Sequence, residues 1–566
     1  MGDSQTDRRA GASHAALMAE LSSLRDLLAK RDNQLGSLVD QLKERDNRLA
    51  EQDERLAELT GLIRDLRDEI RLLKNLPRRP ELKPSGLAAS GASGAGRSKT
   101  EGKGRKKGRG PRRRNPNLHR RDERVALEDV PEGAERRGYQ AHTVRDIVFH
   151  AEEVTWRREV WRFPDGSRHV APLAPGVAAG RSQYGPGVKA LVIMLYHQCQ
   201  STVQRIAALL NGLGLEISAR QVGRFLNGDT RVIVEEQQEV LRAGMENAAW
   251  INVDDTGARH RAANGYCTVI GNDVFTHFRS TGSKSRLNFL ECLCAGDVAY
   301  SVNDAGLEYM RRMKLTGKAV RRLAADRQRR FADADEWRTH LAALGIDRMK
   351  VFPDPVKIAT EGALWGSICD AGRIAGTVIL SDDAGQFNVG DAHSLCWVHA
   401  ERLVRKQGGS SEFQRMRVDA VLDDVWGYYR ELSAYRKTPC NTRAQALSLR
   451  FDEIFGRRTG HASLDKLLRR LRANKDELLR VLEYPATPLN SNLAENDIRA
   501  HVTRRKISFG SRSESGRAAR DACLGALKTC NKLGVPFWDY LCNRLGVAGA
   551  AEVPRLAEII TRRATA

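Results

Sequence analysis

The sequence has no pair of cysteines at the spacing of a zinc site, although it contains ten cysteines. Cys292 and Cys294 lie close together, and the others are scattered. Such a distribution indicates reduced thiols in a cytosolic protein rather than a disulfide framework. Cys396 and His399 have the spacing of half a zinc site, but no second pair accompanies them, and we expect no zinc there.

Long apolar runs are also missing. No stretch reaches the length that spans a membrane, and the N-terminal residues are too polar for a signal peptide. We therefore expect a cytoplasmic protein without a membrane partner.

Acidic residues are scarce relative to basic ones, since 93 Lys and Arg face 71 Asp and Glu, for a formal net charge of +22. Half of that excess is local, because Gly96–Arg121 holds twelve Lys or Arg and one Glu. A charge balance of this kind favours a polyanionic partner, most plausibly nucleic acid.

Hydrophobic residues repeat every seven positions between residues 17 and 76. Position a of this repeat is Leu or Ile throughout, whereas position d is polar at Arg31, Arg45 and Gln52. The eight a positions are Leu21, Leu28, Leu35, Leu42, Leu49, Leu56, Ile63 and Ile70. The pattern predicts a coiled-coil dimerisation helix, with a parallel dimer as the first choice. The alternative is a single long surface helix.

Residues 77–125 are rich in Pro, Gly, Ser and basic residues, which predicts a flexible basic linker. Its charge favours an arm that neutralises phosphates without reading sequence, and the alternative is a solvated charge run. Residues 135–175 alternate more and contain the turn Pro164-Asp165-Gly166, which predicts a small β segment.

Residues 186–230 are predicted to form a helix-turn-helix DNA-binding region: an apolar helix, GVKALVIMLYHQ, is followed by helix, glycine-containing turn and helix in the usual proportions. We expect Ser218 to cap the second helix and Arg220, Gln221 and Arg224 to point outward towards DNA. An ordinary helical hairpin in the core is the alternative.

Two apolar strands are expected to end in paired acids. Ala248–Val253 precedes Asp254-Asp255, and Val378–Leu380 precedes Asp382-Asp383. Two further strands are expected around Gly271-Asn272. This order is that of the opening of a ribonuclease-H-like mixed sheet, so we predict an α/β catalytic core over residues 245–400 and 486–545. Residues 401–485 show helical patterns and no such strand, which predicts a helical insertion.

A third acid, Glu495, lies at the start of an expected helix that Ser491 or Asn492 can cap. Basic residues follow it, namely Arg499, Arg504, Arg505 and Lys506. Each acidic pair alone is more simply a turn or a cap, but three acidic sites in this order favour an all-oxygen site for Mg²⁺ or Mn²⁺. Two such ions about 4 Å apart cleave and join phosphodiesters.

Three segments resemble the DDE transposases of the insertion sequence 66 type. VDDTGARH (253–260) is similar to the family's Asp-Glu-Thr-Gly segment, and LSDDAGQF with the following CWVHAERL is similar to its Asp-Gly-Tyr and Cys-Trp-x-His. LNSNLAENDIRAHVTRRKISFGSRSESGRAA is close to its Asn-Asn-x-x-Glu, Arg-Lys and Gly-Ser segment. The resemblance covers roughly residues 140–545. The family's short N-terminal zinc-binding segment is not visible here, and an Asp-Asp pair replaces Asp-Gly.

The resemblance implies a transposase that cuts DNA at insertion-sequence ends and joins the 3′-hydroxyl to target DNA. It implies that Asp254, Asp382 and Glu495 are catalytic and bind the metal, with Asp382 preferred over Asp383. Arg499, Arg504, Arg505 and Lys506 are then expected to hold phosphates, and the alternative is a solvated helix face.

The implied partners are terminal inverted repeats, target DNA and possible accessory proteins of the same element, in a bacterial cytoplasm at the nucleoid. One alternative function is a transposase-derived DNA-binding or regulatory protein without strand transfer. A ribonuclease-H-like nuclease that only cleaves is another.

Overall fold

The computed structural model describes residues 151–173 and 184–565, except 375, 391 and 409–410, together with a few residues between Met18 and Gln140. The chain divides into two units, Met1–Tyr139 and Gln140–Ala566. In the first unit, residues 21–28 are helical and exposed, which is compatible with the expected coiled coil. Most of that coiled coil and all of the basic linker lie outside the described residues, so both stay predictions.

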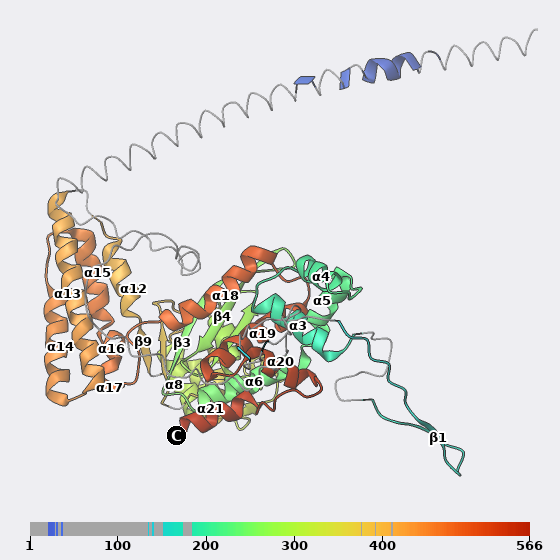
Figure 1. Cartoon of the computed structure of the whole chain (residues 1–566). Coiled ribbons are helices and arrows are strands. Elements are labelled where there is room, and N and C mark those ends of the chain that lie inside the picture. Colours follow the sequence, from blue (N-terminus) through green and yellow to red (C-terminus); the bar gives the residue numbers. More distant parts are fainter. Residues whose placement is uncertain are drawn as a thin grey trace, which may run out of the picture. The chain divides into compact units, whose positions relative to one another are not determined.

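A five-stranded mixed sheet lies at the centre of the second unit (Figure 1), in the order β5-β4-β3-β8-β9. The first three strands pair antiparallel, and β3–β8 and β8–β9 pair parallel. The strands are β3 (Trp250–His260), β4 (Ala263–Gly271), β5 (Thr276–Thr281), β8 (Val378–Ser381) and β9 (His393–Leu395). A mixed sheet of this order with flanking helices is consistent with a ribonuclease-H-like core.

The first acidic strand differs from the expectation. Strand β3 does not end before Asp254 but continues to His260, because its second half forms a long hairpin with β4 in which Asp254 lies opposite Val269. What ends near the acid is the parallel pairing with β8, whose last partners are Asn252 and Leu380. The two acids of β3 therefore lie just beyond the point at which β8 stops pairing with β3.

Helices cover the sheet. Helix α18 (Asn492–Ser508) packs on β3 and β4, and α19 (Glu514–Leu533) packs on β5 and on α6 (Arg231–Glu246). The chain between β5 and β8 is mainly helical but also contains a two-stranded sheet, β6 (Tyr300–Ser301) with β7 (Arg330–Phe331). Its helices are α7 (Arg286–Leu293), α8 (Asp304–Arg312), α9 (Gly317–Ala325), α10 (Ala334–Ala343) and α11 (Pro355–Asp370).

Residues 397–483 are helical and have a hydrophobic core of their own. Trp397 is at its centre, with ring centroids 5.3 Å from Tyr428 and 6.1 Å from Phe455. Trp397 also ties the two ends of the segment together, because its backbone N–H donates to the Leu489 carbonyl (2.9 Å) and its indole N–H to the Leu478 carbonyl (2.9 Å). The helices are α12 (Trp397–Arg405), α13 (Glu412–Lys437), α14 (Asn441–Gly456), α15 (Ala462–Ala473), α16 (Lys475–Leu478) and α17 (Arg480–Glu483).

Three helices precede the sheet: α3 (Pro186–His197), α4 (Val203–Gly212) and α5 (Ala219–Gly228). Ser218 caps α5, since its hydroxyl accepts a hydrogen bond from the Gln221 N–H. The bounds of α4 and α5 match the expected pair of helices. Their reading of DNA stays a prediction. At the end of the chain lie α20 (Phe537–Leu545) and α21 (Leu556–Ala564).

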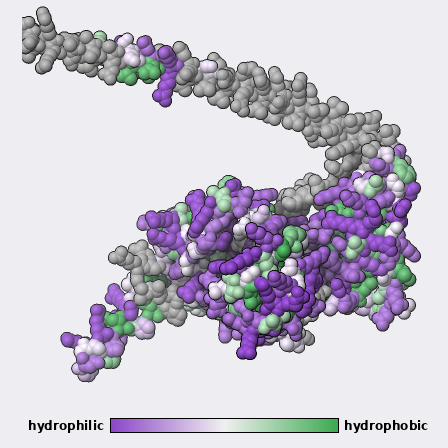
Figure 2. Space-filling model, turned by 180° about the vertical axis from the view of Figure 1, so that it is seen from behind, coloured by the Kyte–Doolittle hydropathy of each residue, from purple (hydrophilic) through white to green (hydrophobic). Residues whose placement is uncertain are grey.

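A short hairpin, β1 (Val160–Arg162) with β2 (Arg168–Val170), stands in place of the expected β segment. Figure 2 shows a mostly hydrophilic surface, on which the hairpin at the lower left carries hydrophobic and hydrophilic residues together. Trp161 and Phe163 are among its exposed side chains. None of the described helices combines the length and the hydrophobicity needed to cross a membrane.

Candidate active site

The parallel pairing of β3 and β8 brings two of the predicted acids to adjacent positions. The last paired residues are Asn252 and Leu380, and Asp254 and Asp382 each follow two residues later, close enough for the charge of Asp382 to act on Asp254. Both side chains are half-buried. The pKa of Asp254 is raised to about 6, first by burial and then by the neighbouring charge of Asp382, against a hydrogen bond from the Asp255 N–H.

The second member of each acidic pair has a basic partner. Asp255 accepts from Lys284 (2.5 Å) and from the Gln386 amide (2.7 Å). Asp383 is exposed and pairs with Arg470. Among the described residues no lysine or arginine pairs with Asp254 or Asp382. The geometry therefore distinguishes Asp254 and Asp382 as the carboxylates without a basic partner.

Glu495 lies in the first turn of α18, the helix that packs across β3. The expected side-chain cap is not formed: Ser491 is the N-cap residue, and its hydroxyl makes no capping hydrogen bond. The Arg402 guanidinium binds both oxygens of Glu495, at 2.7 and 3.4 Å, and thereby lowers the pKa of Glu495.

His399 lies close to all three acids. Its Nε2 lies 3.8 Å from a Glu495 oxygen. A hydrogen bond to Cys396 and the charge of Asp382 raise the pKa of His399, and its own charge acts on Asp254. Neither His399 nor Arg402 was predicted from the sequence to lie at this site. Their spacing of three residues on α12 was the available signal, since it puts both on one helix face.

The oxygen donors suit a hard divalent cation, because two half-buried carboxylates lie together without a basic residue to neutralise them. The ligand oxygens of the three acids are not all close enough together to bind one ion. Among the described residues, one group of three candidate metal ligands has its ligand atoms within 4.8 Å of one another. That group lies elsewhere in the structure. Glu495 is held instead by Arg402, so ligation by all three acids requires this carboxylate to exchange partners.

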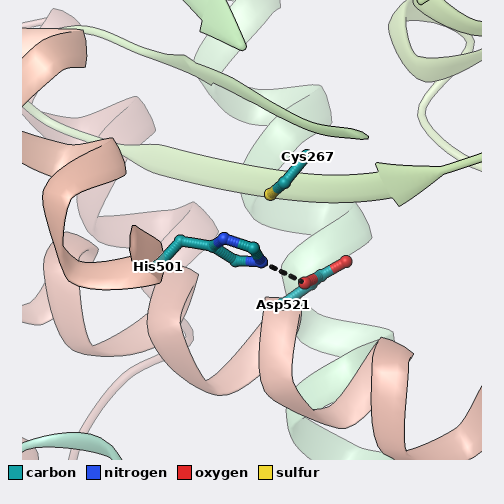
Figure 3. Close-up of side chains that lie close together, drawn as sticks. All are labelled: Cys267, His501 and Asp521. Carbon is teal, nitrogen blue, oxygen red and sulfur yellow. Dashed lines mark ion pairs between the residues drawn. The ribbon is translucent and has the colours of Figure 1, made fainter. Parts of the chain in front are cut away.

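That other group consists of Cys267 on β4, His501 on α18 and Asp521 on α19 (Figure 3). The Asp521 oxygens already accept from the Ser280 N–H (2.7 Å) and hydroxyl (3.0 Å). Burial raises the pKa of the Cys267 thiol well above its ordinary value and lowers the pKa of His501 to about 3. A protonated thiol is a poor metal ligand, so we interpret this group as part of the core.

The predicted DNA-binding residues separate into two groups. Arg499 and Lys506 are exposed, and Arg505 is half-buried over β3 near Gly257. Arg220 and Arg224 are exposed on α5, and Gln221 is half-exposed.

The prediction for Arg504 is wrong. Its side chain is fully buried, donates to the carbonyl oxygens of Tyr196 and Ser201, and stacks on the Tyr196 ring at 3.9 Å. It joins α18 to the end of α3, and because it is buried it is not accessible to a phosphate.

A protein family and one individual protein are similar to parts of this chain. The model of the transposase IS66 family matches residues 374–519, which include Asp382 and Glu495. The chain is also 47% identical over 326 residues to "Uncharacterized protein y4jO" of Sinorhizobium fredii, a match that covers 57% of this chain and 100% of that protein. On these similarities, the chain belongs to the IS66 family of transposases.

Proposed function

We propose that this transposase is a DDE enzyme, which cuts DNA at the ends of an insertion sequence and transfers the freed 3′-hydroxyl to target DNA. The observation that carries the proposal is the adjacent placement of Asp254 and Asp382, with Glu495 on the helix that crosses the same strand. Family membership supports the transposase function, and the arrangement of the acids supports this chemistry.

Asp254, Asp382 and Glu495 would hold Mg²⁺ or Mn²⁺. Such ions activate a water or a 3′-hydroxyl and stabilise the leaving oxygen of a phosphodiester. Lys284 and Gln386 bind Asp255, and Arg470 pairs with Asp383, so these two carboxylates would not be free to bind the ion. Arg499, Arg505 and Lys506 would contact phosphates beside Glu495.

The remaining parts of the chain fit the same function. The helices α4 and α5 would bind the terminal inverted repeats through Arg220, Gln221 and Arg224. A coiled coil over residues 17–76 would pair two subunits, as joining two DNA ends requires. Accessory proteins of the same element are possible partners.

The direct test uses the full chain, labelled DNA that carries the ends of its insertion sequence, a target plasmid and Mg²⁺. We expect cleaved ends and joined products. Asp254→Asn, Asp382→Asn and Glu495→Gln should each reduce both by about 10³-fold or more, since each removes a ligand of the charge-stabilising site. Asp383→Asn is the matched control for Asp382→Asn and should keep the activity.

The outcomes separate the alternatives. Cleavage without joining would identify a nuclease, and specific binding of the ends without cleavage would identify a regulatory protein. Equal activity of Asp382→Asn and the wild type would reject the assigned site.

A further inference from the structure

A groove of about 530 Å³ lies between the helix pair α4–α5 and the segment 507–516, which links α18 to α19. A second, more open hollow of about 570 Å³ adjoins it along α5 and shares Gly223 and Asn227 with it. Arg220 and Arg224 line this second hollow. The two together run from the exposed face of α5 to the end of the helix that carries Glu495.

The groove is lined by a buried cation, Arg520, whose nearest carboxylate makes no hydrogen bond to it. Arg520 is 6% exposed, and its Nε and Nη2 have no hydrogen-bond partner among the described residues. Its Nε lies 4.0 Å from an Asp521 oxygen, but Ser280 already donates to both oxygens of that carboxylate. A buried guanidinium with unused donors is unfavourable unless an anion binds it.

The surroundings of Arg520 are electropositive. The nearby guanidinium of Arg504 donates to the Ser508 hydroxyl and to the backbone carbonyl oxygens of Tyr196 and Ser201. Burial and the charges of Arg504 and Arg520 lower the pKa of His197, another residue of the groove, to about 3. Arg512 adds an exposed positive charge at the edge. The electrostatics therefore favour a phosphate group.

The walls of the groove suit a nucleobase. Tyr196, Val203 and Leu226 line one side, and Ile507 and Phe509 line the other. A volume of about 530 Å³ is far larger than a phosphate ion requires. Aromatic side chains beside a positive groove are the usual means of binding unpaired nucleotides.

Phe509 is presented in an unusual way. Its side chain is 76% exposed, and its backbone has a φ of 58°, a conformation that residues other than glycine rarely adopt. The segment is fixed at the next residues, because the Ser511 N–H donates to the Arg259 carbonyl (3.0 Å) and the Arg261 N–H to the Ser511 carbonyl (2.9 Å). At Gly510 a side chain would lie 2.3 Å from the Arg259 carbonyl oxygen, so the close approach requires glycine.

We propose that this groove holds one unstacked nucleotide of a DNA strand, with its phosphate on Arg520 and its base against the aromatic and aliphatic walls. The inference rests on the proposed function only for the identity of the polymer. An unstacked nucleotide is the form in which a base becomes accessible outside the duplex.

The test uses the full chain in EDTA, so that no cleavage is needed, and a single-stranded oligonucleotide with one 5-iododeoxyuridine. Irradiation should crosslink this base to Phe509 or Tyr196, as mapped by mass spectrometry. Arg520→Met should abolish that crosslink and weaken binding roughly tenfold, with a salt slope reduced by about 0.7 for one lost phosphate contact. Arg338→Met, on the exposed face of α10, is the matched control and should change neither.

Phe509→Gly distinguishes a loss of binding from a loss of folding. It removes an exposed side chain and relieves the left-handed backbone, so its melting temperature should equal or exceed that of the wild type while binding still weakens.

Three outcomes would overturn the proposal. One is crosslinking confined to other segments. Another is equal loss of single-stranded and duplex binding in Arg520→Met, which would indicate a simple backbone contact. The third is complete competition by millimolar inorganic phosphate, which would indicate a site for free phosphate. Loss of cleavage in Asp254→Asn with the crosslink retained separates this proposal from the proposed function.

Discussion

At the scale of single residues, the site is defined by which carboxylates have a basic partner and which do not. Asp255 and Asp383 are held by Lys284 and Arg470, whereas Asp254 and Asp382 lie together. The three acidic segments could be identified from the sequence. Within the second segment, Asp382 was preferred over Asp383 without a physical reason. The pairing of Asp383 with Arg470, 87 residues away, supplies that reason and has no trace in the local sequence.

Arg402 is bound to the carboxylate of Glu495, which the metal ion would need as a ligand. We predict that Arg402→Met binds Mn²⁺ severalfold more tightly than the wild type, because the ion no longer competes with a guanidinium at Glu495. Calorimetry without DNA measures this. Arg405→Met, which removes the partner of Glu401 on the same helix, is the control. Weaker Mn²⁺ binding by Arg402→Met would show that Arg402 orients Glu495 rather than competing for it.

Buried neutral histidines predict a loss of stability in acid. Burial lowers the pKa of His277 to about 4, and the pKa values of His197 and His501 to about 3. Below pH 6.5 the unfolded chain takes up protons that the folded chain does not, so stability is complete above that pH and falls as the pH falls. At pH 5 each histidine contributes a loss of about 2 kcal/mol.

The measurement is the difference in free energy of unfolding between pH 7 and pH 5, from urea titrations. His277→Gln should reduce this difference by about 2 kcal/mol, whatever its effect on packing at pH 7. His169→Gln, on the exposed hairpin, should leave the difference unchanged. An unaltered difference in His277→Gln would contradict the assignment.

At the scale of elements, strands and helices with a regular pattern were predictable, and their ends were not. The apolar run before Asp254 correctly indicated a strand, but β3 continues through two charged residues because β4 supplies partners from Asn252 to His260. Arg504 was predicted to lie on the exposed, phosphate-binding face of α18 because its neighbours in the sequence are basic. The structure buries it because its guanidinium reaches the carbonyl oxygens of Tyr196 on α3 and of Ser201 just after that helix, about 300 residues earlier in the chain.

The helical segment 397–483 depends on one indole. Trp397→Ala should destabilise it by about 3–5 kcal/mol, because the side chain is 1% exposed and fills the centre of a core separate from that of the sheet. Denaturant titration followed by circular dichroism measures this. Trp426→Ala, which removes an indole that is 37% exposed on α13, should cost much less. Equal effects of the two substitutions would mean that Trp397 is not central.

At the scale of the whole molecule, the excess positive charge predicts binding that is sensitive to salt but insensitive to sequence. Deleting residues 96–121 removes twelve basic residues and one acidic residue. We expect weaker binding to every duplex by the same factor, and a smaller salt slope, because each lost phosphate contact lowers the slope by about 0.9. A loss confined to one DNA sequence would contradict this role of the arm.

The heptad repeat predicts the oligomeric state. Deleting residues 17–76 should convert a dimer to monomers in light scattering, because leucine and isoleucine at the a positions then lose their partner helix. A dimer that persists after the deletion would assign self-association to another surface.

The Trp397 contacts with Leu478 and Leu489 have a consequence for how the chain tolerates change. Since the chain enters and leaves the helical segment at neighbouring points, the segment behaves as a closed loop attached at its base. Lengthening such a loop changes the closure entropy only slowly. The part of the segment between α12 and α15 can therefore be shortened or extended without moving His399 relative to Glu495, and the number of residues between the second and third acids sets no distance in the site.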